Sequence, residues 1–216
     1  MFFNIHTHQS PIENEYCIRN LHEDFDTIQS NYYYSLGLHP WYINSNQYPT
    51  DFEKLKIQSL KKNVLSIGEC GLDRICNTAF KLQEEVFRQH ILWANEIAKP
   101  LIIHCVKAHA ECIRILKESN NIMPVIFHGF HNKWEIADQL LQKEYYLSFG
   151  KSLFDPQMEK VFTATPIERI FLETDDSNHN ILEIYIKAAT LRQISIDQLH
   201  SQIRKNAHLI FNTPIP

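Results

Sequence analysis

The amino-acid sequence predicts an α/β protein with the (β/α)8 TIM barrel fold. Short apolar runs rich in β-branched and aromatic residues alternate with longer stretches of helical periodicity, and this alternation predicts parallel strand pairing. Counted generously there are eight such runs, which is the number of strands that closes a barrel. The 216 residues fit one domain over 1–216. We expect a slightly reduced barrel, because the first loop lacks its helix.

Each expected strand is a short apolar run that stops at a polar residue, a glycine or a proline. The first begins at Phe2 and leads straight into His6. The other strands are expected at Tyr16–Ile18, Tyr32–Leu38, Val64–Gly68, Leu101–Ile103, Pro124–Phe127, Tyr145–Phe149 and Arg169–Leu172.

Helical patterns separate these runs. Capping-box patterns that begin at Thr50, Asn132 and Ser195 mark three helix starts, because each offers a side-chain acceptor to the third residue beyond it. The helices are expected at Thr50–Lys62, Phe80–Ala98, Ala108–Ser119, Asn132–Lys143, Pro156–Phe162, Ile181–Arg192 and Ser195–Phe211.

Composition narrows the function classes. The net charge of −4 and the pI of about 6.3 argue against a broad basic surface that grips long duplex DNA. The five cysteines include no C-x-x-C pair, and the N-terminus leads into a strand rather than a signal peptide, so we expect reduced thiols in a cytoplasmic protein. No apolar run is long enough to span a membrane. The oligomeric state stays open.

Histidine is unusually frequent, with 12 in the chain, and two of these residues form an H-x-H pair at the end of the first strand. Side chains in a strand have a period of two, so His6 and His8 are expected to point to the same side. Two imidazoles on one side can chelate a metal ion. The alternative is a pair of partly exposed histidines in a turn.

Other expected strands also end on residues that can bind metal. In a parallel barrel the carboxyl ends of all strands lie on one face, so these dispersed residues are expected to converge. Four imidazoles and two carboxylates suit two divalent ions about 3.5–4 Å apart, with one carboxylate as a bridge. Taken singly, each histidine could be a polar cap and each acid a helix cap. The residues are His6, His8, Glu69, His104, His128 and Asp175.

The order of these motifs resembles the TatD family of metal-dependent deoxyribonucleases, which are amidohydrolase-like barrels. The likeness extends from Asn4 to about Phe211, and its most specific part is the G-E-C-G-L-D segment that ends at Asp73. The turn Gly37–Pro40 matches the G-x-H-P pattern of the family, and the E-T-D motif ends at Asp175.

The resemblance implies a role for each matching residue. His6, His8 and Asp175 would hold one ion, and His104 with His128 would hold the second. Glu69 would bridge the two ions, and Asp175 would also act as the general base toward the attacking water. Mixed nitrogen and oxygen ligation permits Zn2+, Mn2+ or Mg2+.

The surroundings of these residues depart from the family pattern. Asn4 stands where the family has aspartate, and Asp176 adds a carboxylate beside the site. Candidate phosphate contacts follow the strand ends, at Arg74, Lys107 and His131, although each could equally be a solvated surface charge.

Three functions remain in competition. The first is a two-metal phosphodiesterase, a 3′–5′ exodeoxyribonuclease that acts on the ends of single-stranded DNA. The second is a related barrel hydrolase for a small phosphoester, a lactone or a cyclic amide. Several of those enzymes bridge their metals with a carboxylated lysine, and Glu69 favours the first reading. The third is a metal-binding protein without catalysis, against which the intact ligand set argues.

Overall fold

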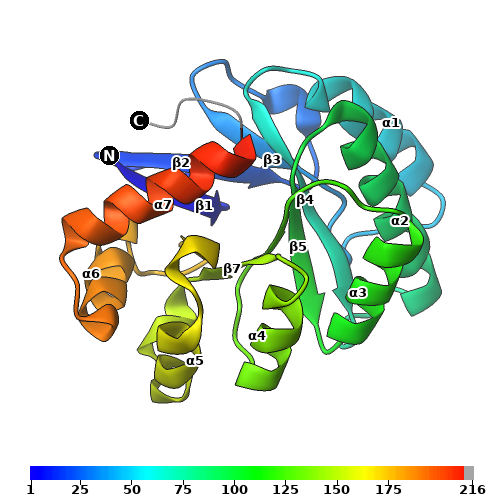
Figure 1. Ribbon diagram of the computed structural model, residues 1–216. Helices are drawn as coiled ribbons and strands as arrows, with labels where there is room; N and C mark the ends of the chain where they lie inside the picture. The colour runs from blue at the N-terminus through cyan, green and yellow to red at the C-terminus, as the bar shows by residue number, and fades with distance from the viewer. Residues whose placement is uncertain (212–216) are drawn as a thin grey trace. The chain divides into compact units, whose positions relative to one another are not determined.

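The structure is a computed structural model that describes residues 1–211 (Figure 1). The strands are β1 (Phe2–Thr7), β2 (Glu15–Leu21), β3 (Tyr33–Leu36), β4 (Val64–Asp73), β5 (Leu101–Val106), β6 (Val125–Phe127), β7 (Tyr146–Phe149) and β8 (Ile170–Leu172). Within the described residues no helix separates β1 from β2, as predicted, and only a short 3-10 helix lies between β2 and β3, whereas α-helices alternate with the strands from β3 onward. Residues 212–216 of the expected domain lie outside the described part, and the single domain stays a prediction.

The α-helices also follow the expected order. They are α1 (Tyr48–Ser59), α2 (Phe80–Ile97), α3 (His109–Glu118), α4 (Trp134–Leu141), α5 (Glu159–Ala164), α6 (Ile181–Arg192) and α7 (Ile196–Phe211). The short 3-10 helices are η1 (Phe25–Thr27), η2 (Lys151–Phe154), η3 (Pro156–Met158) and η4 (Ile167–Arg169). The helix predicted over Pro156–Phe162 covers η3 and the start of α5, and the other three 3-10 helices were not predicted. Within residues 1–211, no helix is both long and apolar enough to cross a membrane.

The eight strands form one sheet in which neighbours follow chain order. The ladders of β1 with β2, β3 with β4, β4 with β5, β6 with β7, and β7 with β8 are all parallel. An isolated parallel bridge between Thr7 and Asp175 links the residues that follow β8 to the end of β1. This strand order is that of a (β/α)8 barrel, so the predicted fold class is confirmed.

The chain divides into two compact units, and the first contains residues 1–19 and the chain from Ile126 onward. Its core is aromatic. Phe3 of β1 packs edge-on against Phe171 of β8, with ring centroids 6.1 Å apart. The Tyr185 hydroxyl of α6 donates to the Phe3 carbonyl over 3.0 Å. Asn206 of α7 donates to the carbonyls of Ile167 and Ile170, so two C-terminal helices are attached to β1 and to the start of β8.

The second unit contains residues 20–125. Figure 1 shows α1, α2 and α3 along the same side of β3, β4 and β5. Every residue of β4 is buried, because the strand is paired on both edges and covered by helices. Helix α2 buries Val86, Phe87 and Ile91 on one face, as its periodicity predicts, and ends at Ala98 in the left-handed conformation.

The ends of two strands and two of the predicted capping boxes differ from the predictions. β4 continues to Asp73 and β5 to Val106, so Glu69 and His104 lie within strands and not at their ends. The capping box at Thr50 is wrong, because α1 already begins at Tyr48. The box at Asn132 is also wrong, because α4 begins without a side-chain cap.

The third predicted box is present. Ser195 Oγ accepts from the Gln198 N–H, and Gln198 Oε1 accepts from the Ser195 N–H. A further capping box joins Asn180 and Glu183 at the start of α6. The sequence patterns predicted this helix with the correct bounds but did not predict its capping box.

Candidate metal centre

In the first unit, His6 near the end of β1 meets His8, just beyond that strand, and Asp175, which follows β8. The two imidazoles point the same way, as the period of the strand predicts, and their centroids lie 5.1 Å apart. Asp175 Oδ1 lies 3.7 Å from His6 Nε2 and 3.5 Å from His8 Nε2. The backbone holds Asp175 there, because its N–H donates to the His6 carbonyl and its carbonyl accepts from the His8 N–H.

Asn4 supports this group from within β1. Its Oδ1 accepts from the Thr174 N–H over 3.1 Å, and its Nδ2 donates to Thr174 Oγ1 over 2.8 Å. Nδ2 also donates to Glu15 Oε1 over 2.6 Å. Asn4 is fully buried, so these bonds are shielded from water and fix the residue that precedes Asp175.

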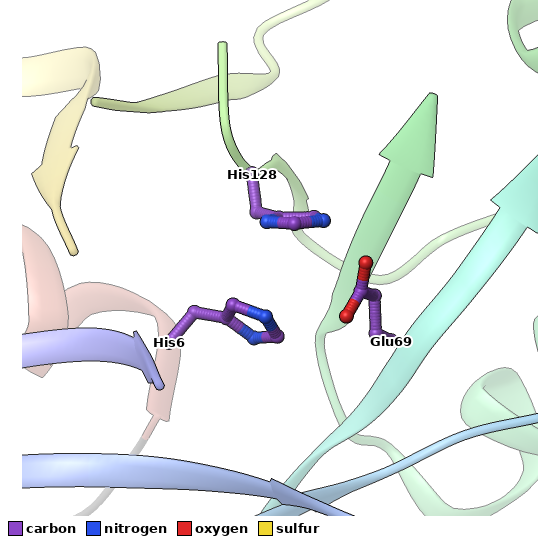
Figure 2. Close-up of side chains that lie close together, drawn as sticks. All are labelled: His6, Glu69 and His128. Carbon is purple, nitrogen blue, oxygen red and sulfur yellow. The ribbon is translucent and has the colours of Figure 1, made fainter. Parts of the chain in front are cut away.

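His128 follows β6 and faces His6, and the centroids of their rings are 4.3 Å apart (Figure 2). Glu173 lies beside His128. Its Oε1 accepts from the Gly129 N–H over 2.7 Å and lies 3.4 Å from His128 Nδ1. Its Oε2 is buried and has no hydrogen-bond partner within the described residues. A buried carboxylate oxygen of this kind is costly unless a cation or a proton satisfies it.

Glu69, also labelled in Figure 2, belongs to the second unit, where it joins His39 and His104. Glu69 Oε1 lies 2.8 Å from His104 Nδ1 and 3.1 Å from His39 Nε2. The ladder between β4 and β5 shifts register between Ile67 and Cys70. An extra residue of this kind re-aims a side chain that a regular strand would direct elsewhere.

Asp73, at the end of β4, orients His104. Its Oδ2 lies 3.0 Å from His104 Nε2 and accepts from Trp41 Nε1 over 2.6 Å. Burial opposes ionisation of Asp73, but the hydrogen bonds from His104 and Trp41 hold its pKa below the usual value. A proton on His104 Nε2, held by this carboxylate, leaves the Nδ1 lone pair directed at the Glu69 group.

The donor sets fit divalent metal ions. Within single units, three groups each bring histidine nitrogen and carboxylate oxygen atoms within 4.8 Å of one another. His6–His8–Asp175 and His39–Glu69–His104 each offer two imidazole nitrogens and one carboxylate oxygen, whereas His128–Glu173–Asp175 offers one imidazole nitrogen and two carboxylate oxygens. Mixed nitrogen and oxygen ligands of this kind suit Zn2+, Mn2+ and Fe2+ better than ions that prefer oxygen alone.

The predicted phosphate contacts are exposed, and two of them have carboxylate partners. Arg74 forms an ion pair with Glu111, and its guanidinium lies 4.3 Å from the centre of the Phe80 ring. His131 Nε2 lies 2.8 Å from Asp155 Oδ2. Lys107 has a left-handed backbone conformation. Their role in phosphate binding stays a prediction.

The sequence analysis missed three residues of these groups. His39 and Asp73 are the polar members of the G-L-H-P turn and the G-E-C-G-L-D segment, so a polar residue within each quoted motif was the available signal. Glu173 begins the E-T-D motif and would have been found by counting every carboxylate of that motif.

A (β/α)8 fold with histidine and carboxylate groups around its strand ends defines the class of barrel metal-dependent hydrolases. The family described as TatD related DNase matches residues 10–212, and the chain belongs to this family.

Similar proteins agree with this assignment. A protein of Buchnera aphidicola subsp. Baizongia pistaciae named "Uncharacterized metal-dependent hydrolase" is 32% identical over 199 residues, which cover 83% of this chain and 74% of that protein. "Uncharacterized metal-dependent hydrolase YabD" of Bacillus subtilis is 29% identical over 208 residues, which cover 88% of this chain and 79% of that protein.

Solved structures share the fold at lower identity. A hydrolase of the TatD family from Entamoeba histolytica has a TM-score of 0.82 at 17% identity, over 97% of each chain. The TatD homologue YJJV from Escherichia coli has a TM-score of 0.79 at 20% identity, over 92% of this chain and 86% of the other. At these identities the likeness demonstrates the fold.

Proposed function

We propose that this chain is a two-metal phosphodiesterase, a 3′–5′ exodeoxyribonuclease that trims the ends of single-stranded DNA. The observation that carries the proposal is the group formed by His6, His8 and Asp175. It combines two imidazoles, which can donate lone pairs to a metal ion, with a carboxylate. Asp175 Oδ1 lies within 3.7 Å of Nε2 of both His6 and His8. This donor set, which lies within the first unit alone, supports hydrolysis by a metal-activated water.

Each residue has a distinct assignment. His6, His8 and Asp175 would hold one ion within the first unit, and Glu69, His104 and His128 are the other residues to which we assign a metal-binding role. Asp175 also accepts the proton of the attacking water. Bound Zn2+, Mn2+ or Mg2+ would supply Lewis-acid activation of water and would neutralise charge on the phosphodiester.

Two further carboxylates keep the imidazoles in place. Asp73 holds His104 through Nε2, and Glu173 holds the segment of His128 through the Gly129 N–H. Neighbours of this kind fix ring orientation and tautomer, so the ligands need little rearrangement when an ion binds.

The cytoplasm is the compartment we propose for this reaction. The five cysteines are all free thiols, and Cys112 Sγ donates a hydrogen bond to Cys105 Sγ over 3.5 Å rather than forming a disulfide. Unpaired thiols in this number are typical of a reducing compartment.

The test uses protein that has been stripped with a chelator and reloaded with Mg2+, Mn2+ or Zn2+. A single-stranded DNA oligonucleotide labelled at its 3′ end should release labelled mononucleotide, and the same strand labelled at its 5′ end should shorten progressively. Blunt duplex DNA and RNA of the same sequence serve as comparisons. If metal-loaded protein cleaves none of these strands but hydrolyses a small phosphoester or a lactone, the nuclease proposal is wrong.

A further inference from the structure

The turn that carries His39 exposes two large aromatic side chains. Trp41 is 54% exposed and Tyr42 is 60% exposed. The Trp41 ring lies 5.3 Å from the His39 ring and 6.2 Å from the His104 ring, measured between centroids. The exposed indole therefore adjoins the His39–Glu69–His104 group within the same unit. Exposed aromatic surface beside a candidate catalytic group calls for a functional explanation.

The indole is fixed in place although its surface is open. Trp41 Nε1 donates to Asp73 Oδ2 over 2.6 Å, and the Trp41 N–H donates to His39 Nδ1 over 3.2 Å. Both acceptors belong to the hydrogen-bond network of His104. An indole whose nitrogen is already held by a hydrogen bond loses little conformational freedom when a base stacks on it. Binding to it therefore costs less conformational entropy than binding to a mobile side chain.

The neighbouring ring extends the aromatic surface. Tyr42 stacks on His22, with centroids 4.6 Å apart and an angle of 21° between the planes. Its N–H donates to the His39 carbonyl over 3.0 Å, which ties the turn to the candidate metal ligand. The pair Trp41 and Tyr42 thus forms a short aromatic surface on a turn held by hydrogen bonds.

Electrostatic attraction to phosphates is a weak source of affinity for a polynucleotide in this chain. The chain has a net charge of −4, and both Arg74 and His131 contact carboxylates. Phosphate contacts alone would then give weak and strongly salt-dependent binding. Base stacking on an aromatic ring is tolerant of sequence and contributes without cationic side chains.

We propose that Trp41 is the stacking surface for a nucleobase next to the scissile phosphodiester. This inference rests on the proposed function and deepens it, because it names a substrate contact. The base stacks on the exposed indole, while Asp73 holds the indole nitrogen and keeps the ring beside His104. Recognition is therefore by stacking and not by base identity.

The first experiment compares two substrates that differ only in whether the nucleotides at the 3′ end carry bases. One is a single-stranded oligonucleotide, and the other is the same strand with abasic nucleotides at its 3′ end. In Trp41→Ala the KM for the base-bearing strand should rise roughly 5- to 150-fold. The KM for the abasic strand should stay as in the wild-type protein. An equal loss on both substrates would mean that Trp41 merely supports the site, and would overturn the proposal.

Two variants sharpen this comparison. Trp41→Phe keeps a ring but loses the N–H that Asp73 accepts, so its KM for the base-bearing strand should fall between those of wild type and Trp41→Ala. Leu92→Ala removes an exposed apolar side chain on α2 and should leave both KM values unchanged. Thermal unfolding of each variant shows whether the fold is intact.

The second experiment detects stacking without catalysis. Trp93 is buried and Trp134 is partly exposed, so Trp134→Phe leaves Trp41 as the tryptophan with large exposure. In this background, titration with the base-bearing strand should quench fluorescence, and the abasic strand should quench much less. Quenching without cleavage would refute the nuclease function and retain the stacking surface. Cleavage with no quenching and an unchanged KM in Trp41→Ala would refute the stacking surface alone.

Discussion

Asn4 Nδ2 donates to Glu15 Oε1 over 2.6 Å, and Asn4 occupies the position where the family pattern has aspartate. Two carboxylates at that separation would repel each other and lose the hydrogen bond. The negative charge at this place therefore belongs to Glu15 on the second strand and not to the first strand. The departure from the family pattern is local, because Asn4 still accepts from the Thr174 N–H next to Asp175.

Asn4→Asp should lower the free energy of unfolding by about 2–4 kcal/mol, because it places a second carboxylate in a buried position. The loss should be largest above the pKa of the introduced acid. Glu15→Gln in the same chain should recover part of it, since the new amide can donate to the introduced carboxylate. Denaturant unfolding at neutral pH measures the four proteins of this cycle. Equal stability of Asn4→Asp and wild type would contradict the repulsion argument.

Asp175→Asn should reduce kcat by about a hundredfold to ten-thousandfold, because an amide cannot take a proton from water. The fold should persist, since the backbone bonds of Asp175 to His6 and His8 do not involve the side chain. Asparagine also tolerates the positive φ of 52° at this position. Steady-state kinetics and thermal unfolding, measured on the same preparation, check both parts. Substantial residual turnover would remove Asp175 as the base.

His90 should make stability depend on pH. Burial lowers its pKa from 6.5 to about 4, because the charged ring would be desolvated, and the hydrogen bond from Nδ1 to the Val86 carbonyl only partly opposes this shift. Nε2 accepts from the Leu38 N–H, which gives the ring its second hydrogen bond. The unfolded state binds more protons than the folded state between these values, so stability falls as pH drops from about 6.5 to about 4. The contribution is about 3 kcal/mol across this window.

The matched variant is His90→Gln, whose amide can replace both hydrogen bonds but does not titrate. The difference in unfolding free energy between wild type and variant should shrink toward acid pH, and denaturant titrations at several pH values give that difference. A difference that stays constant over the window would show that His90 keeps its ordinary pKa in the folded protein.

Gly71 and Gly129 offer a pair of alanine substitutions with different costs. Both have positive φ, but a Cβ at Gly71 would lie 2.1 Å from the His104 carbonyl oxygen. At Gly129 the nearest atom is a side-chain oxygen of Glu173 at 3.7 Å. Gly71→Ala should cost about 3 kcal/mol or more, and Gly129→Ala about 1 kcal/mol. Thermal unfolding compares them, and equal midpoints would refute the close approach at Gly71.

Local patterns in the sequence were enough to predict the strands and most of the helices. The period of two within the H-x-H pair correctly predicted that His6 and His8 share a side, because side-chain direction in a strand depends only on neighbouring residues. The apolar periodicity of Phe80–Ala98 likewise predicted α2 nearly to its last residue. Propensity and periodicity act over a few residues, and a sequence displays them directly.

Only the tertiary structure decided how the ligands meet. Asp175 reaches His6 through a backbone bridge between residues far apart in the chain. Glu69 is aimed by a register shift within β4, whose buried length continues past the expected end. Asp73 becomes the partner of His104 through the pairing of β4 with β5, and the partner of Trp41 through the packing of the turn that follows β3. Register and bulges depend on contacts between distant segments, and no local pattern of residues encodes them.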